Sequence, residues 1–229
     1  MSNLDIEQGS EAWKELRLGR VTASRAADVI AKTKTGWGAS RANYMAQLVA
    51  ERLTGTAAEG FSNAAMQWGT DTEPQARLAY EFRTDATVEQ IAFAPHPTIE
   101  MSGASPDGII GDDGLVEIKC PNTATHIETL RSGKIAEKYV TQMMWQMAST
   151  GRAWCDFVSF DPRMPESMSL WIHRIERDEE MIAYLEKHII EFLAELDGIV
   201  AELSRLYGAP TFELPLDERG YSADDYLSQ

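Results

Sequence analysis

The sequence predicts a mixed α/β (α+β) fold, in which a β-sheet core is flanked by helices and followed by a long C-terminal helix. The clearest sign is a β-hairpin over 109–118, whose turn at 111–114 reads Gly-Asp-Asp-Gly. Gly and Asp tolerate the positive φ angles of tight hairpin turns. Two further strand-like runs lie at 153–160 and 168–175, and residues 179–207 repeat apolar side chains at helical spacing.

Length and composition favour a single domain over 1–229, of which 209–229 form an acidic tail. The two cysteines make neither a disulfide framework nor a zinc site, and no apolar run is long enough for a membrane span or a signal peptide, so we expect a cytoplasmic protein without a membrane partner. The net charge of −15 opposes nonspecific DNA binding. Residues 12–41 are the exception, with seven basic and two acidic side chains, which suits an enzyme whose basic surface faces inward.

Apolar periodicity and capping residues place the remaining elements. We expect helices over 11–18, over 24–30 with Ser24 as N-cap, from Ser40 to Gly55, from Asp71 or Thr72 with Glu73 in the first turn, and over 123–130 and 138–150, with a strand over 87–94. Asp178 is positioned to cap the C-terminal helix, which spans about 45 Å if unbroken. Its apolar stripe suits the sheet or a neighbouring subunit.

The predicted hairpin carries the residues most typical of metal chemistry. Side chains alternate along a strand, so Glu117 and Lys119 share one face of it, and Asp107 stands at the hairpin's mouth. A buried acid and lysine side by side are costly to desolvate unless a cation joins them. Asp107, Glu117 and the Ile118 carbonyl therefore form a candidate Mg²⁺ site, with Mn²⁺ as a possible substitute. Lys119 would orient or deprotonate a water and neutralise developing charge.

Several short strings in the chain resemble one nuclease family. Pro106-Asp107 followed by Glu117-Ile118-Lys119 is similar to the bipartite signature of the PD-(D/E)XK nuclease superfamily. Longer strings, in order, resemble the lambda exonuclease (YqaJ-like viral recombinase, alkaline exonuclease) family: Leu16-Arg17-Leu18-Gly19, Val21-Thr22-Ala23-Ser24, Trp68-Gly69 with Glu73, Ser105-Pro106-Asp107-Gly108, Glu117-Ile118-Lys119-Cys120-Pro121 and Asp161-Pro162-Arg163-Met164. The resemblance covers most of the chain and implies a restriction-endonuclease-like sheet.

The resemblance also implies roles for residues outside the hairpin. Arg17, Ser24 and Ser105 match positions that hold a terminal 5′-phosphate of DNA. Glu73 and Gln142 match catalytic positions near the metal-bound water. From the residues alone, Glu73 also suits simple stabilisation of a helix N-terminus.

Three more residues match DNA-contacting positions of the family. Lys32 and Lys34 lie in a basic, glycine-bearing stretch that contacts the duplex in relatives, although the residues alone are equally typical of a mobile surface loop. Met66 matches a position where the family places an apolar side chain as a wedge beside the ends of the DNA strands. A methionine side chain by itself is more typical of packing in the core.

The resemblance therefore implies a metal-dependent exodeoxyribonuclease. It would digest one strand of linear duplex DNA in the 5′→3′ direction, release 5′-mononucleotides and leave a 3′ overhang for recombination by strand annealing. A homotrimeric ring, an annealing-protein partner and a bacterial or phage-infected cell are implied with it. The alternatives are a restriction-like endonuclease of the same fold and a non-catalytic module that binds DNA ends.

Overall fold

A computed structural model describes residues 6–58 and 63–208, so the predicted acidic tail at 209–229 lies outside the described part. Its centre is a mixed sheet of β6 (Gly108–Ile110), β7 (Gly114–Lys119), β8 (Trp154–Phe160) and β9 (Leu170–Glu176), in that order. β7 pairs antiparallel with β6 and parallel with β8, while β8 and β9 are antiparallel. The predicted hairpin and mixed sheet are confirmed.

Two glycines of the hairpin are explained by close approach rather than by turn geometry alone. A Cβ on Gly108 would lie 2.1 Å from a methyl group of Val88, and one on Gly114 would lie 2.2 Å from the Trp154 ring. Gly111 alone of the turn's two glycines has a positive φ, at 50°. Gly114 therefore serves packing between β7 and β8, not the turn that the sequence suggested.

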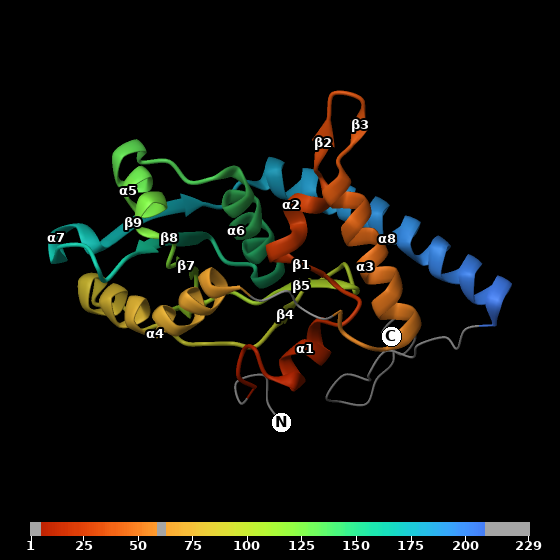
Figure 1. Cartoon of the computed structure of the whole chain (residues 1–229), viewed down its shortest axis with the longest axis horizontal. Helices are drawn as coiled ribbons and strands as arrows, with labels where there is room; N and C mark the ends of the chain where they lie inside the picture. Colours follow the sequence, from red (N-terminus) through yellow and green to blue (C-terminus); the bar gives the residue numbers. More distant parts are fainter. Residues whose placement is uncertain (1–5, 59–62, 209–229) are drawn as a thin grey trace.

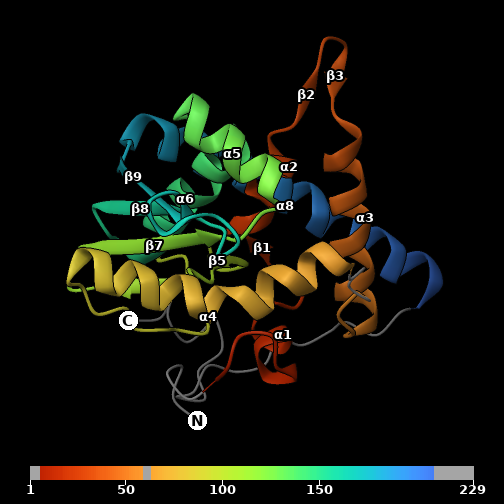
Figure 2. The same ribbon diagram turned by 60° about the vertical axis from the view of Figure 1, so that its left-hand side comes forward.

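The two faces of the central sheet are covered by different helices (Figure 2). Leu115 and Phe157 point to the side of α6 (Glu137–Thr150), in the larger hydrophobic cluster. Val116, Ile118 and Val158 point to the side of α4 (Ala64–Thr84), in a second cluster. Glu117 and Lys119 therefore face the α6 side, as strand alternation predicted.

A long helical arm extends from the sheet, built from α3 (Ala39–Thr54) and α8 (Glu179–Tyr207) (Figure 1). Tyr44 stacks on Phe192 with ring centroids 5.8 Å apart. The predicted apolar stripe of α8 is buried at Ile182, Leu185, Ile189, Phe192, Leu193 and Leu196. Asp178 caps α8 as predicted, because its carboxylate accepts from the N–H groups of Glu180 and Met181.

A smaller sheet joins the N-terminal region to the hairpin. β1 (Val21–Thr22) pairs parallel with β5 (Ser102–Ala104), and β4 (Ala94–Pro95) pairs antiparallel with β5. The strand predicted over 87–94 is largely wrong, since only a bridge between Glu89 and Ile109 precedes β4. β6 is three residues long and offers that segment little backbone to pair with.

Three predicted helix starts are wrong. Ser24 lies inside a 3₁₀ turn, η1 (Ala23–Arg25), before the short α2 (Ala26–Val29), and caps neither. α3 begins at Ala39 behind Gly38 instead of at Ser40. α4 begins at Ala64, because the Asn63 side chain accepts from the Met66 N–H and the following residues are good helix formers.

The short helices form largely as predicted, whereas the basic segment around Lys32 and Lys34 does not. α1 (Glu11–Arg17) and α5 (Thr123–Ser132) form nearly as predicted, and α7 (Glu166–Ser169) precedes β9. The segment read as a loop is instead a small antiparallel hairpin of β2 (Lys32–Thr33) and β3 (Gly36–Trp37), which projects from the body (Figure 1).

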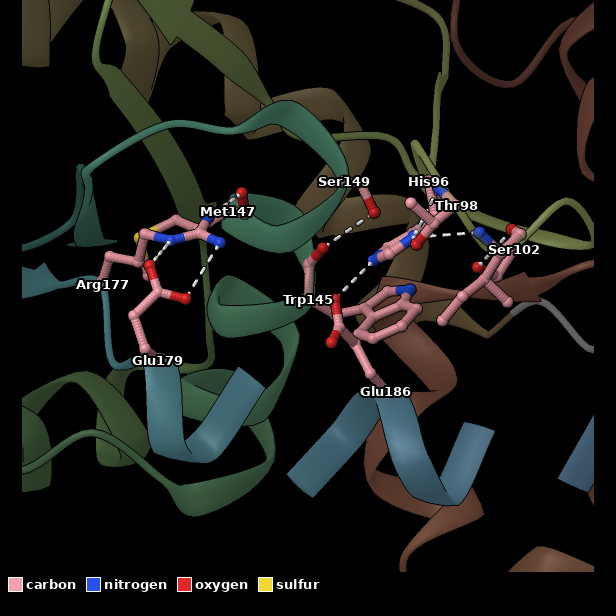
Figure 3. Close-up of polar contacts among 10 residues, drawn as sticks. His96, Thr98, Ser102, Trp145, Met147, Ser149, Arg177, Glu179 and Glu186 are labelled. Atoms are coloured by element: carbon pink, nitrogen blue, oxygen red, sulfur yellow. Dashed lines mark hydrogen bonds and ion pairs between the residues drawn. The ribbon is translucent and has the colours of Figure 1, made fainter. Parts of the chain in front are cut away.

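A buried histidine ties the small sheet to the helices (Figure 3). The His96 ring stacks on Trp145 of α6 at 4.7 Å and points its Nε2 at the Glu186 carboxylate of α8, 3.4 Å away. Its Nδ1 accepts from the backbone N–H groups of Thr98 and Ile99, so the proton of the neutral ring sits on Nε2. Burial, followed by the charge of Arg177, lowers the pKa of His96 to about 4.

Both cysteines are free and buried, and burial raises the pKa of the Cys120 thiol to about 12. In the described residues, no helix is long and apolar enough to cross a membrane.

Candidate active site

Asp107, Glu117 and Lys119 converge at the carboxyl end of β7. Asp107 Oδ2 accepts the Ile118 N–H at 2.6 Å, because β6 begins at Gly108, opposite Val116, and stops two residues short of pairing with Ile118. Glu117 is fully buried and its carboxylate forms an ion pair with the Lys119 ammonium. The three side chains predicted to share a site are therefore brought together.

Two glutamines of α6 complete the surroundings of Glu117. Gln142 Nε2 donates to Glu117 Oε1 at 2.7 Å and Gln146 Nε2 donates to Oε2 at 2.6 Å. Gln142 was predicted at the site, whereas Gln146 was missed. The signal was present, since two amides at i and i+4 share one face of a helix whose remaining buried positions are mostly apolar.

Electrostatics distinguish the members of this cluster. Burial raises the pKa of Asp107 well above its ordinary value, and the neighbouring Glu117 charge raises it further. Burial works to lower the pKa of Lys119, but the charges of Glu117 and Asp107 outweigh it and hold that pKa above its ordinary value. Lys119 is thus a cation beside two acids, and the ionised form of Asp107 has no cation of its own within the cluster.

Glu73 reaches this end of the sheet from the middle of α4. The predicted place in a first helical turn is wrong, because α4 starts nine residues earlier, so the helix-terminus interpretation of Glu73 falls away. Its carboxylate pairs with Arg77 at 2.5 Å. Burial raises the pKa of Glu73, while Arg77 and then Lys119 oppose the shift. The influence of Lys119 places Glu73 within the same electrostatic group.

The donor set suits a hard divalent cation that keeps several waters. In a strand the N–H and C=O of one residue point to the same side, and the Ile118 N–H points to Asp107, so the Ile118 carbonyl points there as well. Two carboxylates and a carbonyl match the few protein ligands that Mg²⁺ takes. The described residues contain no group of three or more His, Cys, Asp or Glu side chains suited to a metal, which excludes a zinc-like cage from this part of the chain.

The residues predicted to hold a 5′-phosphate also meet. The Arg17 guanidinium donates to Ser105 Oγ at 3.2 Å and lies 3.5 Å from Ser24 Oγ and 3.4 Å from Thr22 Oγ1. Trp13 completes this group of side chains, which we call the anion pocket. The Arg17 guanidinium lies 4.2 Å from the centroid of the Trp13 ring, and Trp13 Nε1 donates to Ser105 Oγ.

Arg17 has no ion-pair partner among the described residues, and burial lowers its pKa. A partly buried arginine ringed by hydroxyl groups and without a carboxylate partner is chemically suited to bind an anion. The helix predicted to begin at Ser24 does not contribute a helix terminus to this site, because α2 is a four-residue helix and Ser24 does not cap it.

The anion pocket and the acid cluster are joined covalently. Ser105 and Asp107 are separated only by Pro106, so their Cα atoms are at most about 7 Å apart. Tyr139, which the sequence analysis did not single out, borders the acid cluster, with its ring centroid 5.4 Å from Lys119 Nζ.

The predicted DNA-contacting residues lie apart from the acid cluster. The Lys32 ammonium donates to the Tyr184 hydroxyl at 3.3 Å and lies 5.1 Å from the Trp37 ring, so it fastens the β2–β3 hairpin to α8. Lys34 is exposed at the tip of that hairpin. Met66 is 55% exposed on α4, so a place in the core is wrong for it.

Comparisons with known proteins agree with this fold. The YqaJ-like viral recombinase domain matches residues 12–153. An alkaline exonuclease, LHK-Exo, from Laribacter hongkongensis is 52% identical with a TM-score of 0.82, over 87% of this chain and 98% of its own, and the same figures hold for its complex with dAMP. A phage-related exonuclease from Haemophilus somnus 129PT, 16% identical over 83% of this chain and 99% of its own, has the same fold with a TM-score of 0.64. None of the curated proteins matches.

The fold and its neighbours define the class of protein as a DNA exonuclease. Within that class, the chain belongs to the YqaJ-like viral recombinase family, the family of lambda exonuclease.

Proposed function

We propose that the protein is a Mg²⁺-dependent 5′→3′ exonuclease that digests one strand of linear duplex DNA, releases 5′-mononucleotides and leaves a 3′ overhang. The observation that carries this proposal is the direct connection between the anion pocket and the acid cluster through Ser105-Pro106-Asp107. A terminal 5′-phosphate held by Arg17 places the next phosphodiester near Asp107 and Glu117. Cleavage there releases one nucleotide, and a deoxynucleoside monophosphate, dAMP, is the ligand of the similar LHK-Exo complex.

Asp107, Glu117 and the Ile118 carbonyl are the residues that would hold the cation. When bound, Mg²⁺ supplies Lewis-acid stabilisation of the phosphate and lowers the pKa of a bound water. Mn²⁺ offers the same hard-oxygen chemistry. The raised pKa of Asp107 supports the assignment, because a carboxylate whose ionised form is disfavoured by burial and by a second carboxylate gains most from a bound cation.

Three side chains of the protein then act on the reacting groups. Lys119, a cation at neutral pH, stabilises the charge that develops on the phosphate instead of removing a proton from water. Glu73, whose pKa burial raises toward neutrality, accepts the proton of the attacking water. Gln142 fixes the orientation of Glu117 through its 2.7 Å hydrogen bond.

The experiment is digestion of a linear duplex labelled separately at each 5′ and 3′ end, with and without Mg²⁺. We expect early release of labelled 5′-mononucleotides, persistence of the 3′ labels, no reaction without metal, and an untouched covalently closed circle. Cutting of the circle would favour a restriction-like endonuclease, and binding without cutting would favour a non-catalytic module.

The phosphate pocket has its own test in Arg17→Ala. Wild type should prefer a 5′-phosphorylated over a 5′-hydroxyl end, and the variant should lose that preference while retaining cleavage of both ends. An unchanged ratio would remove Arg17 from phosphate recognition.

The proposal extends to assembly and cellular context. A protein with a net charge of −15 has little general electrostatic affinity for DNA, but a homotrimeric ring that encloses the duplex would keep the DNA bound without it. Lys32, Lys34 and Met66 would then border the duplex. Mass measurement in solution should give about three times 25.5 kDa; an active monomer would contradict the ring. A single-strand annealing protein that takes up the 3′ overhang, in the bacterial cytoplasm, completes this proposal.

A further inference from the structure

Arg163 is held flat at the edge of the central sheet. Its Nε and Nη2 donate to the Asp161 carboxylate at 2.7 and 3.0 Å, and its guanidinium carbon lies 4.4 Å above the Trp68 ring. Asp161 is fully buried, and its hydrogen bond from Arg163 lowers its pKa to about 2, so the anchor stays ionised. The arginine side chain is 47% exposed, and none of the hydrogen bonds in the described residues uses its Nη1.

A second arginine has almost the same surroundings. Arg174 donates through Nε and Nη2 to the buried Asp156 at 2.8 and 2.9 Å, lies 3.4 Å from the Trp154 ring, and is also 47% exposed. The protein therefore builds the Asp–Arg–Trp arrangement twice, once on an aspartate within β8 and once on the aspartate that directly follows β8. The second copy shows that the arrangement alone is compatible with a purely structural role.

The position of Arg163 sets it apart. Its Nη2 lies 3.4 Å from the Pro121 carbonyl, two residues after Lys119, and Trp68 precedes Glu73 on α4 by five residues, about 7.5 Å along the helix. Asp156, which anchors Arg174, lies five residues before Asp161, about 17 Å back along the strand. Arg163 thus stands at the edge of the sheet where the parallel strands β7 and β8 end, the edge at which Lys119 lies.

A planar guanidinium with a fixed orientation and a free N–H edge is matched to phosphate oxygens. Since two of its nitrogens and its flat face are already held, little side-chain entropy remains to be lost on binding.

We propose that Arg163 binds a backbone phosphate of the DNA duplex at the entrance of the active site, through its free Nη1 edge. This rests on the proposed function only in taking DNA as the ligand. Arg163 is a substrate-binding residue in this account, and Trp68 and Asp161 are its positioning residues.

The test compares Arg163→Gln with Arg174→Gln, each combined with Lys119→Ala so that the DNA is not consumed. The probe is a short duplex with one 5′-phosphorylated end, and the dissociation constant is measured over a series of salt concentrations. We expect Arg163→Gln to weaken binding about tenfold and to make the slope of log K against log salt shallower by about one. Arg174→Gln, which removes the same charge from the same surroundings, should change neither quantity.

An unchanged salt slope in Arg163→Gln, or equal changes in both variants, would overturn the role of Arg163 while DNA binding by the parent upholds the proposed function. Loss of DNA binding by the parent itself would overturn both proposals. Arg163→Lys keeps a cation beside Asp161 and so controls for a folding defect. This variant should melt near the wild-type temperature and still bind DNA several-fold more weakly. Wild-type affinity in Arg163→Lys would contradict the phosphate contact.

Discussion

Neighbouring strands β7 and β8 carry buried acids that are treated in opposite ways. On β8, Asp156 and Asp161 each receive an arginine fork, and Asp156 also accepts from the Tyr80 hydroxyl at 2.8 Å. On β7, Glu117 shares a single lysine with the nearby Asp107, whose pKa is raised.

This difference between the two strands shows that burial of a carboxylate does not by itself indicate a functional site. A carboxylate with a dedicated arginine is electrostatically complete and belongs to the framework. Two carboxylates that share one cation retain negative charge, and that residual charge is what a divalent ion compensates. Four variants break or sharpen this comparison, and we take them from the largest expected effect to the smallest.

Lys119→Ala should have the largest effect. Removal of the cation that faces the reacting phosphate should lower kcat by at least about 10³-fold, because one well-placed electrostatic contact contributes roughly that much. Affinity for a 5′-phosphorylated end should stay within about threefold of wild type. Lys138→Ala is the matched control, since Lys138 lies beside Tyr139 on α6 but contacts neither acid, and its kcat should be that of wild type. Normal turnover by Lys119→Ala would refute its role.

His96 is a third kind of buried titratable group, kept neutral rather than paired. Its pKa in the folded protein, about 4, lies below its unfolded value of about 6.5, so the unfolded chain takes up the proton first. The resulting stability is fully present above pH 6.5 and is lost as pH falls toward 4, by at most about 3 kcal/mol. Urea unfolding across this range should show a loss in wild type that His96→Gln lacks. Equal pH dependence of the two proteins would contradict the neutral, buried assignment.

Arg174→Ala should destabilise the framework without touching catalysis. It leaves Asp156, which is 3% exposed, without its fork. We expect a loss of about 2 kcal/mol, below the range for fully buried pairs because Arg174 is half-exposed and partly screened. Thermal unfolding should show a Tm lower by roughly 4–8 °C, with unchanged kcat. Adding Asp156→Asn should recover part of the loss; no recovery would mean that the arginine matters through its packing on Trp154.

Asp107→Asn should have the smallest effect on stability, and of the opposite sign. The raised pKa of Asp107 means that its ionised form weakens the metal-free fold, so the neutral amide should stabilise it by about 1 kcal/mol. Saturating Mg²⁺ should raise the Tm of wild type, by the equivalent of about 2.7 kcal/mol at one hundred times Kd, and leave the variant unmoved. A variant less stable than metal-free wild type would mean that ionised Asp107 does not weaken the fold, and that the acids of β7 are as well compensated as those of β8.

The sequence by itself determined the elements whose signals are local. The hairpin that carries Glu117 and Lys119 follows from turn chemistry and strand alternation, and the long helix behind Asp178 follows from side-chain periodicity and a cap, all within a few residues. The pairing of Asp107, Glu117 and Lys119 was predictable for the same reason, since they lie on one hairpin. Arg17, Ser24 and Ser105 were gathered by resemblance, and the capping argument offered for Ser24 was wrong.

Only the tertiary structure decided what depends on distant partners. Trp68, near the start of α4 behind its cap Asn63, contacts Arg163. Gln146 of α6 donates a hydrogen bond to Glu117, and Lys32 donates one to the Tyr184 hydroxyl of α8. Each of these contacts joins residues that no local pattern links. The first two contacts depend on the packing of α4 and α6 on opposite faces of one sheet, and the third depends on the position of α8 beside the β2–β3 hairpin, so each is fixed by neighbours in space and not along the chain.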